Sequence, residues 1–271
     1  MLTKRDISAL LHRYELSPSR ALGQNFVADP NTVRRIARLA RIGAGNRVVE
    51  IGAGLGSLTL ALLETGASVT AVELDRHLLP ALEEVLAGSS AQVVCADATE
   101  LDWEELLGDG DWVMVANLPY NIATSLILDV LDEVPQVHRM LVMVQREVGE
   151  RLVAEPGSRQ FGIPSLKVGY WAEAAVVGRV GRAVFVPKPK VESALVEIRR
   201  RGAPAVAADP ARLFDLVRAG FSQRRKMIRR SLAGLLSADD IVEAGVSPRA
   251  RPEQLSLDEW AKLAEQAGDN V

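Results

Sequence analysis

The chain has 271 residues, of which 48% are hydrophobic, enough to bury a core in one domain or in two. The formal net charge is only −3, so overall charge alone does not require a nucleic-acid partner. The single cysteine, Cys95, excludes a disulfide framework. The sequence has no signal-peptide pattern and no apolar run of about 18–20 residues, so we expect a cytoplasmic protein with no membrane partner.

Two helices are expected before the first strand. Residues 3–14 have a helical pattern that opens on a Thr/Asp cap, and Asp29-Pro30 opens a second helix that runs to about Arg41. Several arginines lie along this second helix and could extend a basic surface, namely Arg34, Arg35, Arg38 and Arg41.

Strands and helices then alternate five times up to about residue 154. The expected strands lie near 47–51, 68–73, 91–96, 111–116 and 139–144. Short turns link them, which predicts right-handed crossovers and a parallel sheet. Two later strand-like stretches, 174–180 and 193–198, flank a Pro-rich loop and predict antiparallel edge strands on this sheet.

The last part of the chain is predicted to be helical. Residues 202–208 read as a linker, and Asp209-Pro210 opens a region of three or four helices that ends near Gln266. We therefore expect one α/β domain over residues 1–202 and a small all-helical domain over 203–271.

A basic segment opens this helical region. Residues 220–232 contain no acid, and their basic residues are Arg224, Arg225, Lys226, Arg229 and Arg230. A solvated helix face is the ordinary explanation of such a run. The lack of acids and the position after an α/β domain favour binding to RNA phosphates.

A glycine-rich loop, Glu50-Ile51-Gly52-Ala53-Gly54-Leu55-Gly56, follows the first strand and opens into a helical pattern. Glycines let the backbone lie against a ligand without a Cβ in between. The spacing lacks the third glycine of the dinucleotide fingerprint, and Glu50 would repel a pyrophosphate. This acid suits a ligand that carries positive charge, such as a sulfonium or an amino group. A plain turn is the alternative for the loop taken alone.

Acids end the next two strands. Glu73, followed by Leu74, stands where doubly wound folds place a carboxylate against ribose hydroxyls. Asp97 could accept a hydrogen bond from an adenine amine while the Ala98 N–H meets a ring nitrogen. Each acid taken singly is more typical of a helix cap. Their common position at successive strand ends, where ligands bind in open α/β sheets, favours a shared site.

The tetrapeptide Asn117-Leu118-Pro119-Tyr120 closes the apolar run of the fourth strand. It offers an amide side chain, a backbone carbonyl and an aromatic ring. Those groups can grip a planar heterocycle with an exocyclic amine by two acceptors and one stacking face. The alternative is a strand-to-helix turn in which Asn caps and Pro stiffens.

These motifs together resemble the family of ribosomal RNA adenine-N6,N6-dimethyltransferases. The matching stretches run in the family's order from about residue 20 to residue 232, and include Leu22-Gly23-Gln24-Asn25-Phe26, Val144-Gln145-Arg146-Glu147, Phe185-x-Pro187-x-Pro189-x-Val191-x-Ser193-Ala194 and Phe221-Ser222-Gln223-Arg224-Arg225-Lys226 as well as the loop and strand-end motifs above. The basic segment and the helical domain resemble the small-subunit branch more than the erythromycin-resistance branch.

The resemblance implies a Rossmann-like methyltransferase sheet that binds S-adenosylmethionine. The positions that match the family's cofactor contacts are Asn25, Val27, Gly52, Gly54, Glu73, Leu74, Asp97, Ala98 and Asn117. Among them, Val27 stands where the family usually carries Leu, a change that leaves a backbone contact intact.

The resemblance also implies a flipped-out adenine in small-subunit ribosomal RNA as the substrate. Tyr120 would stack on the base and Phe185 would press on its opposite face, although Phe185 alone reads as a core residue beside a stiff loop. Asn117 Oδ1 and the Leu118 carbonyl would accept the two amine hydrogens, and Arg224, Arg225 and Lys226 would bind RNA. We expect a monomer that acts on 30S particles during ribosome maturation.

Two other hypotheses stay open. The protein could monitor an immature small subunit, with methylation secondary, or it could be a nucleotide-dependent oxidoreductase, which the glycine spacing disfavours. The histidines His12, His77 and His138 are scattered without ligand spacing, so we expect no metal.

Overall fold

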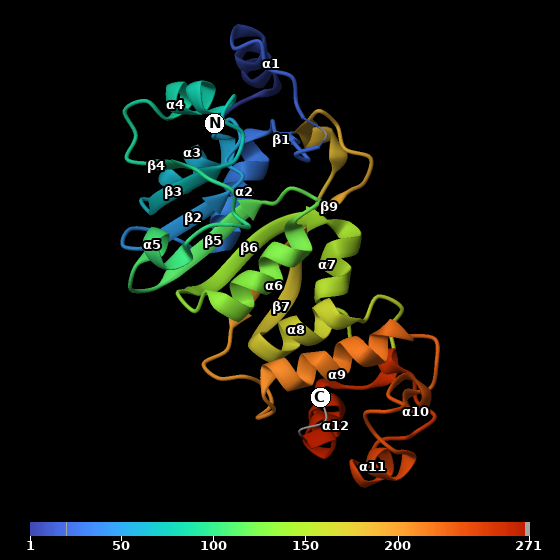
Figure 1. Ribbon diagram of the computed structural model, residues 1–271. Coiled ribbons are helices and arrows are strands. Elements are labelled where there is room, and N and C mark those ends of the chain that lie inside the picture. The colour runs from blue at the N-terminus through green and yellow to red at the C-terminus, as the bar shows by residue number, and fades with distance from the viewer. Residues whose placement is uncertain (20, 269–271) are drawn as a thin grey trace. The chain divides into compact units, whose positions relative to one another are not determined.

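The computed structural model describes residues 1–19 and 21–268, which divide into two compact units (Figure 1). The first unit consists of Met1–Gly149 and Ala175–Arg200, and the second of Glu150–Ala174 and Arg201–Val271. The change of unit at residue 200 lies close to the expected boundary at 202, but residues 150–174 belong to the helical unit. They do so because their apolar side chains pack in its core: the Tyr170 ring lies 5.5 Å from that of Phe214.

A seven-stranded sheet of order β4-β3-β2-β5-β6-β9-β7 forms the centre of the first unit. Its strands are β2 (Arg47–Ile51), β3 (Ser68–Glu73), β4 (Gln92–Cys95), β5 (Trp112–Asn117), β6 (Val137–Gln145), β7 (Ala172–Val180) and β9 (Ser193–Arg200). The pairs among β2 to β6 are parallel, and β9 runs antiparallel to β6. The predicted fold class, a mostly parallel Rossmann-like sheet with late antiparallel strands, is confirmed.

Helices cover both faces of this sheet. The helices that begin in the first unit are α1 (Lys4–Arg13), α2 (Pro30–Ala40), α3 (Ser57–Leu63), α4 (Leu79–Leu86), α5 (Trp103–Leu107), α6 (Ala123–Glu133) and α7 (Arg146–Leu152). In Figure 1, α6 lies in front of the sheet and α2 behind it. Buried side chains of α2 and α3, among them Ile36 and Leu62, form one cluster with strand residues such as Val115 and Leu141.

A second, two-stranded sheet pairs β1 (Phe26–Val27) with β8 (Phe185–Val186) in antiparallel register. The Ala28 N–H extends this ladder by donating to the Val184 carbonyl at 2.7 Å. Strands of two residues carry no periodic signal, so the sequence could not predict this pairing. The pairing holds the segment around Phe26 at the edge of the main sheet, where the strands end.

The second unit is helical around Trp260, whose side chain is fully buried. Its helices are α8 (Ile163–Trp171), α9 (Pro210–Ser222), α10 (Ile228–Ser231), α11 (Ala238–Glu243) and α12 (Leu257–Ala267). Gly220 lets α9 approach α12, because a Cβ at that position would lie 2.4 Å from Cη2 of the Trp260 ring. The predicted helical region after residue 209 is thus confirmed.

Candidate active site

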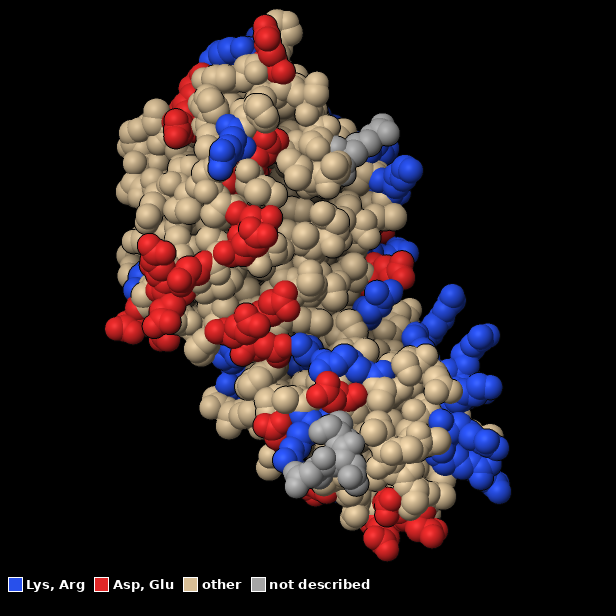
Figure 2. Space-filling view, viewed as in Figure 1, with Lys and Arg blue, Asp and Glu red and all other residues tan. Residues whose placement is uncertain are grey.

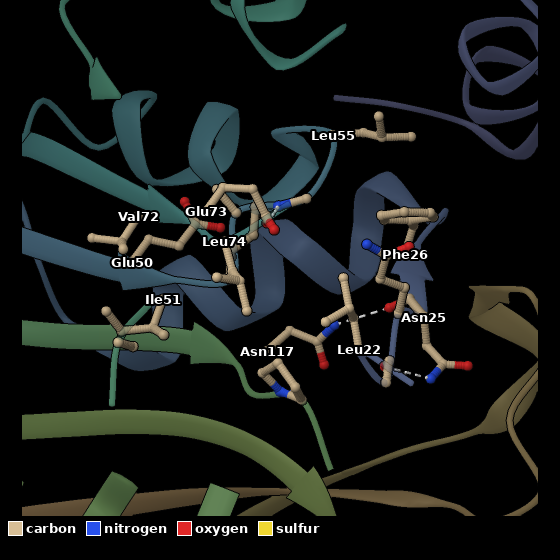
Figure 3. A pocket seen from close by; sticks show the side chains of 18 of the residues that line it. Leu22, Asn25, Phe26, Glu50, Ile51, Leu55, Val72, Glu73, Leu74 and Asn117 are labelled. Atoms are coloured by element: carbon tan, nitrogen blue, oxygen red, sulfur yellow. Dashed lines mark hydrogen bonds between the residues drawn. The ribbon is translucent and has the colours of Figure 1, made fainter. Parts of the chain in front are cut away.

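An open cleft lies at the carboxyl edge of the parallel strands in the first unit. Its walls come from residues within 22–27, 50–58, 72–74 and 96–98 and from Asn117, Pro119 and Ile122, which gather the ends of β2, β3, β4 and β5 under the segment that leads into β1 (Figure 3). All the residues expected to hold the cofactor, namely Asn25, Val27, Gly52, Gly54, Glu73, Leu74, Asp97, Ala98 and Asn117, line this cleft.

The glycine-rich loop lies under the N-terminal segment. Gly54 has a φ of 60°, and a Cβ on it would come within 3.0 Å of the Phe26 ring. Gly56 has a different role, since its Cβ would meet Leu82 Cδ1 of α4 at 2.9 Å. Gly54 thus allows the loop to approach the Phe26 ring at the cleft, and Gly56 allows the loop to pack against α4.

Glu73 is buried and holds the loop in place. One of its carboxylate oxygens accepts the Gly54 N–H at 2.7 Å, and the other accepts the Asp75 N–H at 2.9 Å. Burial raises the pKa of Glu73, while these backbone hydrogen bonds lower it. Each carboxylate oxygen has a second lone pair that can accept a ligand hydroxyl.

Glu50 also lines the cleft, at the end of β2, and only 1% of its surface is exposed. Its Oε2 atom and the Ser57 hydroxyl are buried without a hydrogen-bond partner in the described chain. Burial raises the pKa of Glu50 to about 8 against the lowering effect of the nearby Thr59 hydroxyl, and the charge on Glu73 acts in the same direction as burial. A buried carboxyl group with an unused acceptor fits a cationic group of a ligand.

Asn117 ends β5 with its amide held in one orientation. The Nδ2 atom donates to the Asn25 carbonyl at 3.0 Å, as the dashed line in Figure 3 shows, so the Oδ1 atom is left as the acceptor. Leu118 is buried and its N–H donates to the Met143 carbonyl of β6 at 3.1 Å, whereas Pro119 lines the cleft.

The two aromatic residues expected at the target base lie outside the cleft lining. Tyr120 is half-buried, with its hydroxyl 3.2 Å from that of Ser193. Phe185 is only 2% exposed and packs in the cluster that contains Val27 and Ile36. The expected contact of the Phe185 ring with a base is therefore not available in this structure, because pairing of β8 with β1 turns the ring into the core.

Side-chain hydrogen bonds fix the segment 22–27, and the one from Gln24, which the sequence gave no separate role, ties this segment across the cleft. Gln24 Nε2 donates to Asp75 Oδ2 at 2.7 Å, and Gln24 Oε1 accepts the Ser19 N–H at 2.7 Å. Asn25 Nδ2 donates to the Gly23 carbonyl at 2.9 Å. At the far side, Asp97 Oδ1 accepts the Thr99 N–H at 2.9 Å, which leaves Oδ2 for a ligand.

The basic residues Arg224, Arg225 and Lys226 belong to the second unit, in the turn between α9 and α10. Arg224 donates to the Arg159 carbonyl at 2.8 Å, whereas Arg225 and Lys226 are exposed. Figure 2 shows Lys and Arg side chains gathered along one side of this unit. Within residues 1–19 and 21–268, no cluster of three His, Cys, Asp or Glu could hold a metal ion.

None of the described helices is long and apolar enough to span a membrane. The fold and the cleft define an α/β protein with a nucleoside-type ligand site at the carboxyl edge of its sheet. The chain belongs to the ribosomal RNA adenine dimethylase family, whose model matches residues 17–269, and the resemblance stated from the motifs is confirmed.

Several known proteins are similar to this chain. Ribosomal RNA small subunit methyltransferase A of Kineococcus radiotolerans is 46% identical over 97% of this chain and 91% of its own length. The protein of that name from Thermobifida fusca is 44% identical over 98% and 96%. The crystal structure of the 23S rRNA methyltransferase ErmE is similar to this chain with a TM-score of 0.69 and 28% sequence identity. The match covers 89% of this chain and 98% of the ErmE chain. A dimethyladenosine transferase from Plasmodium falciparum shares the fold with a TM-score of 0.75 at 23% identity, covering 87% and 94%.

Proposed function

We propose that the protein is an S-adenosylmethionine-dependent enzyme that dimethylates the N6 amine of adenine in 16S ribosomal RNA, at two adjacent adenosines, during maturation of the small subunit. Family membership supports the reaction class, and relatives that share 44–46% of their residues carry the name small subunit methyltransferase. The observation that carries the proposal is the fixed amide of Asn117 at the cleft, with its oxygen left to accept.

The cofactor is proposed to lie along the strand ends. Glu73 would accept the ribose hydroxyls through its second lone pairs, and Asp97 with the Ala98 N–H would bind the adenine, beside Leu74. The unpartnered Oε2 of Glu50 is an acceptor for the ammonium group of the methionine end. When bound, S-adenosylmethionine supplies an electrophilic methyl group on a positively charged sulfur.

The chain's part in the reaction is to hold and orient the target amine. The lone pair of an aromatic amine is delocalised into its ring, which makes the nitrogen a poor nucleophile. Asn117 Oδ1 and the Leu118 carbonyl would accept its two hydrogens and favour a pyramidal nitrogen whose lone pair faces the methyl carbon. Positioning of this kind supplies a large part of such accelerations. Because Asn is neutral, a secondary amine can bind for the second transfer without leaving a buried charge unpaired.

Tyr120 is proposed to stack on the extruded base. Its hydroxyl lies 3.2 Å from that of Ser193 on β9, a contact that would fix the orientation of the ring whose face stacks on the base. Phe185 is assigned to the packing of β8 against β1 instead, since its ring is buried.

Methyl transfer from labelled cofactor to unmethylated 30S particles tests the proposal. We expect incorporation of methyl groups at adenines with the wild-type protein and none with Asn117→Ala. Asn31→Ala, which removes an exposed amide in the first turn of α2, is the matched control and should retain full activity. No incorporation with wild-type protein would count decisively against the proposal.

A second candidate function is recognition of an immature subunit, with methylation secondary. The placement of Arg224, Arg225 and Lys226 in a compact unit of their own favours it. Reversal of these charges should weaken binding to 30S particles and lower its salt dependence, while Asn117→Ala should still bind. We further propose a cytoplasmic monomer, and light scattering at working concentration checks the monomeric state.

A further inference from the structure

A row of arginines crosses the first unit on the side of α2. Helix α2 and its C-cap contribute three of them, spaced three residues apart and therefore near one face of the helix. The strands β6, β7 and β9 contribute one each. We refer to these residues as the arginine row, and they are Arg35, Arg38, Arg41, Arg139, Arg179 and Arg199.

Hydrogen bonds and strand register make the row continuous. Arg35 Nη1 donates to the Arg179 carbonyl at 3.0 Å, which ties the middle of α2 to β7. Arg139 Nη2 donates to the Arg41 carbonyl at 3.2 Å, which ties the end of α2 to β6. Arg139 and Arg199 stand directly opposite each other on the antiparallel pair β6 and β9.

The positive charge of the row is poorly compensated. Like charges directly opposite each other on neighbouring strands destabilise a sheet. Glu197 forms an ion pair with Arg199 at 2.9 Å, but residues 30–47 contain no acid. Burial lowers the pKa of Arg139, and the charges of Arg199 and Arg41 lower it further against the opposing effect of Glu197. Arg139 Nε is also buried without a partner in the described chain.

A neighbouring arginine on the same helix shows the contrast. Arg34 forms two parallel hydrogen bonds with Glu64, at 3.0 and 3.1 Å, and so makes a neutral surface pair. Arg38 and Arg41 form no such ion pair in the described chain, although they lie on the same short helix. An ion pair therefore balances the charge of Arg34, whereas no acid in the described chain balances that of Arg38 and Arg41.

We propose that the arginine row binds the phosphate backbone of ribosomal RNA at a second contact, apart from the cofactor cleft. Guanidinium groups match phosphate in geometry as well as charge. Arg139 pairs with Val113 on β5, four residues before Asn117. The two positions are therefore about 13 Å apart along the strands. Phosphate contacts at that distance would fix the register of a large RNA without reading its sequence. The inference rests on the proposed function only in taking RNA as the substrate.

The test compares two double variants of equal net charge. Arg38→Gln with Arg41→Gln removes two exposed members of the row that form no ion pair in the described chain, whereas Arg13→Gln with Arg34→Gln removes two arginines that are paired with Glu84 and Glu64. Binding to protein-free 16S ribosomal RNA is measured by filter binding over a salt series. Each lost phosphate contact lowers the log–log salt slope by about 0.7–0.9. The row variant should lose about 1.6 in slope and about 40-fold in affinity at 0.1 M salt.

The paired-arginine control should bind as the wild type does. Arg38→Lys with Arg41→Lys keeps both charges and should retain the slope, which separates charge from folding defects. An unchanged slope in the glutamine variant would overturn the inference. So would a loss of binding to 30S particles with no change on protein-free RNA, because that result would point to a ribosomal protein as the partner. Methylation by wild-type protein is measured separately, so failure here leaves the proposed function intact.

Discussion

Substitution of Glu50 by glutamine is expected to stabilise the cofactor-free protein in a pH-dependent way. Glu50 is 1% exposed, and its pKa rises from an ordinary 4.5 to about 8 in the folded chain. Between these values the folded state keeps a proton that the unfolded state has lost. Stability therefore falls as the pH rises through this window, and a neutral glutamine of the same shape removes that loss.

The expected gain follows from the width of the window. One pKa unit corresponds to about 1.4 kcal/mol, so the gain should be below about 1 kcal/mol at pH 5 and about 4 kcal/mol at pH 8. Urea unfolding followed by circular dichroism at the two pH values measures it. Cofactor binding should change in the opposite direction: if Glu50 accepts the ammonium group, the variant binds S-adenosylmethionine about tenfold or more weakly in calorimetry.

Glu73→Gln is the matched control, because it makes the same chemical change at the neighbouring buried carboxyl group. Its oxygens accept the N–H groups of Gly54 and Asp75, so one of these donors loses its acceptor and the variant should be destabilised. Equal gains for Glu50→Gln at pH 5 and pH 8, or a loss at pH 8, would refute the reasoning.

Further predictions concern three other contacts. Tyr120→Phe and Ser193→Ala should each lower kcat/KM for 30S particles without changing cofactor affinity. The double variant should lower kcat/KM no further than either single variant, and additive losses would show that the two hydroxyl groups act independently. Gly220→Ala should destabilise the second unit by about 1–3 kcal/mol in thermal unfolding, since the new methyl overlaps the ring of Trp260; an unchanged melting temperature would contradict this. Gln24→Ala should weaken binding of S-adenosylmethionine by freeing the segment over the cleft, with unfolding free energy nearly unchanged; equal affinity would exclude a role in closing the site.

Local pattern was sufficient to predict the sheet and the edge at which the cleft opens. The strands that carry Glu50, Glu73 and Asn117 at their carboxyl ends are apolar runs of ordinary length, and parallel order puts these ends at one edge. Each of these residues could therefore be placed before any contact was known.

Contacts between distant parts of the chain were out of reach of such patterns. The hydrogen bond from Asn117 to the Asn25 carbonyl spans 92 residues, and no spacing in the sequence marks it. Phe185 was expected at the substrate because the pairing of two-residue strands, β1 with β8, is invisible to periodicity. Segment 150–174 was assigned to the wrong unit. The apolar residues of a helix indicate that one face is buried, but they do not indicate which elements bury it.

The chain leaves the first unit at residue 150, returns at 175 and leaves again at 201, so the helical unit is assembled from two separate stretches. Its core joins Leu166 and Tyr170 of α8 to side chains on α9 and α12. During synthesis α8 emerges before α9 and α12. Its apolar side chains therefore stay exposed until the last helix has left the ribosome. For the same reason, truncation after residue 202 would leave the apolar face of α8 exposed and favour aggregation. A truncated protein that also lacks residues 150–174 would not expose this face.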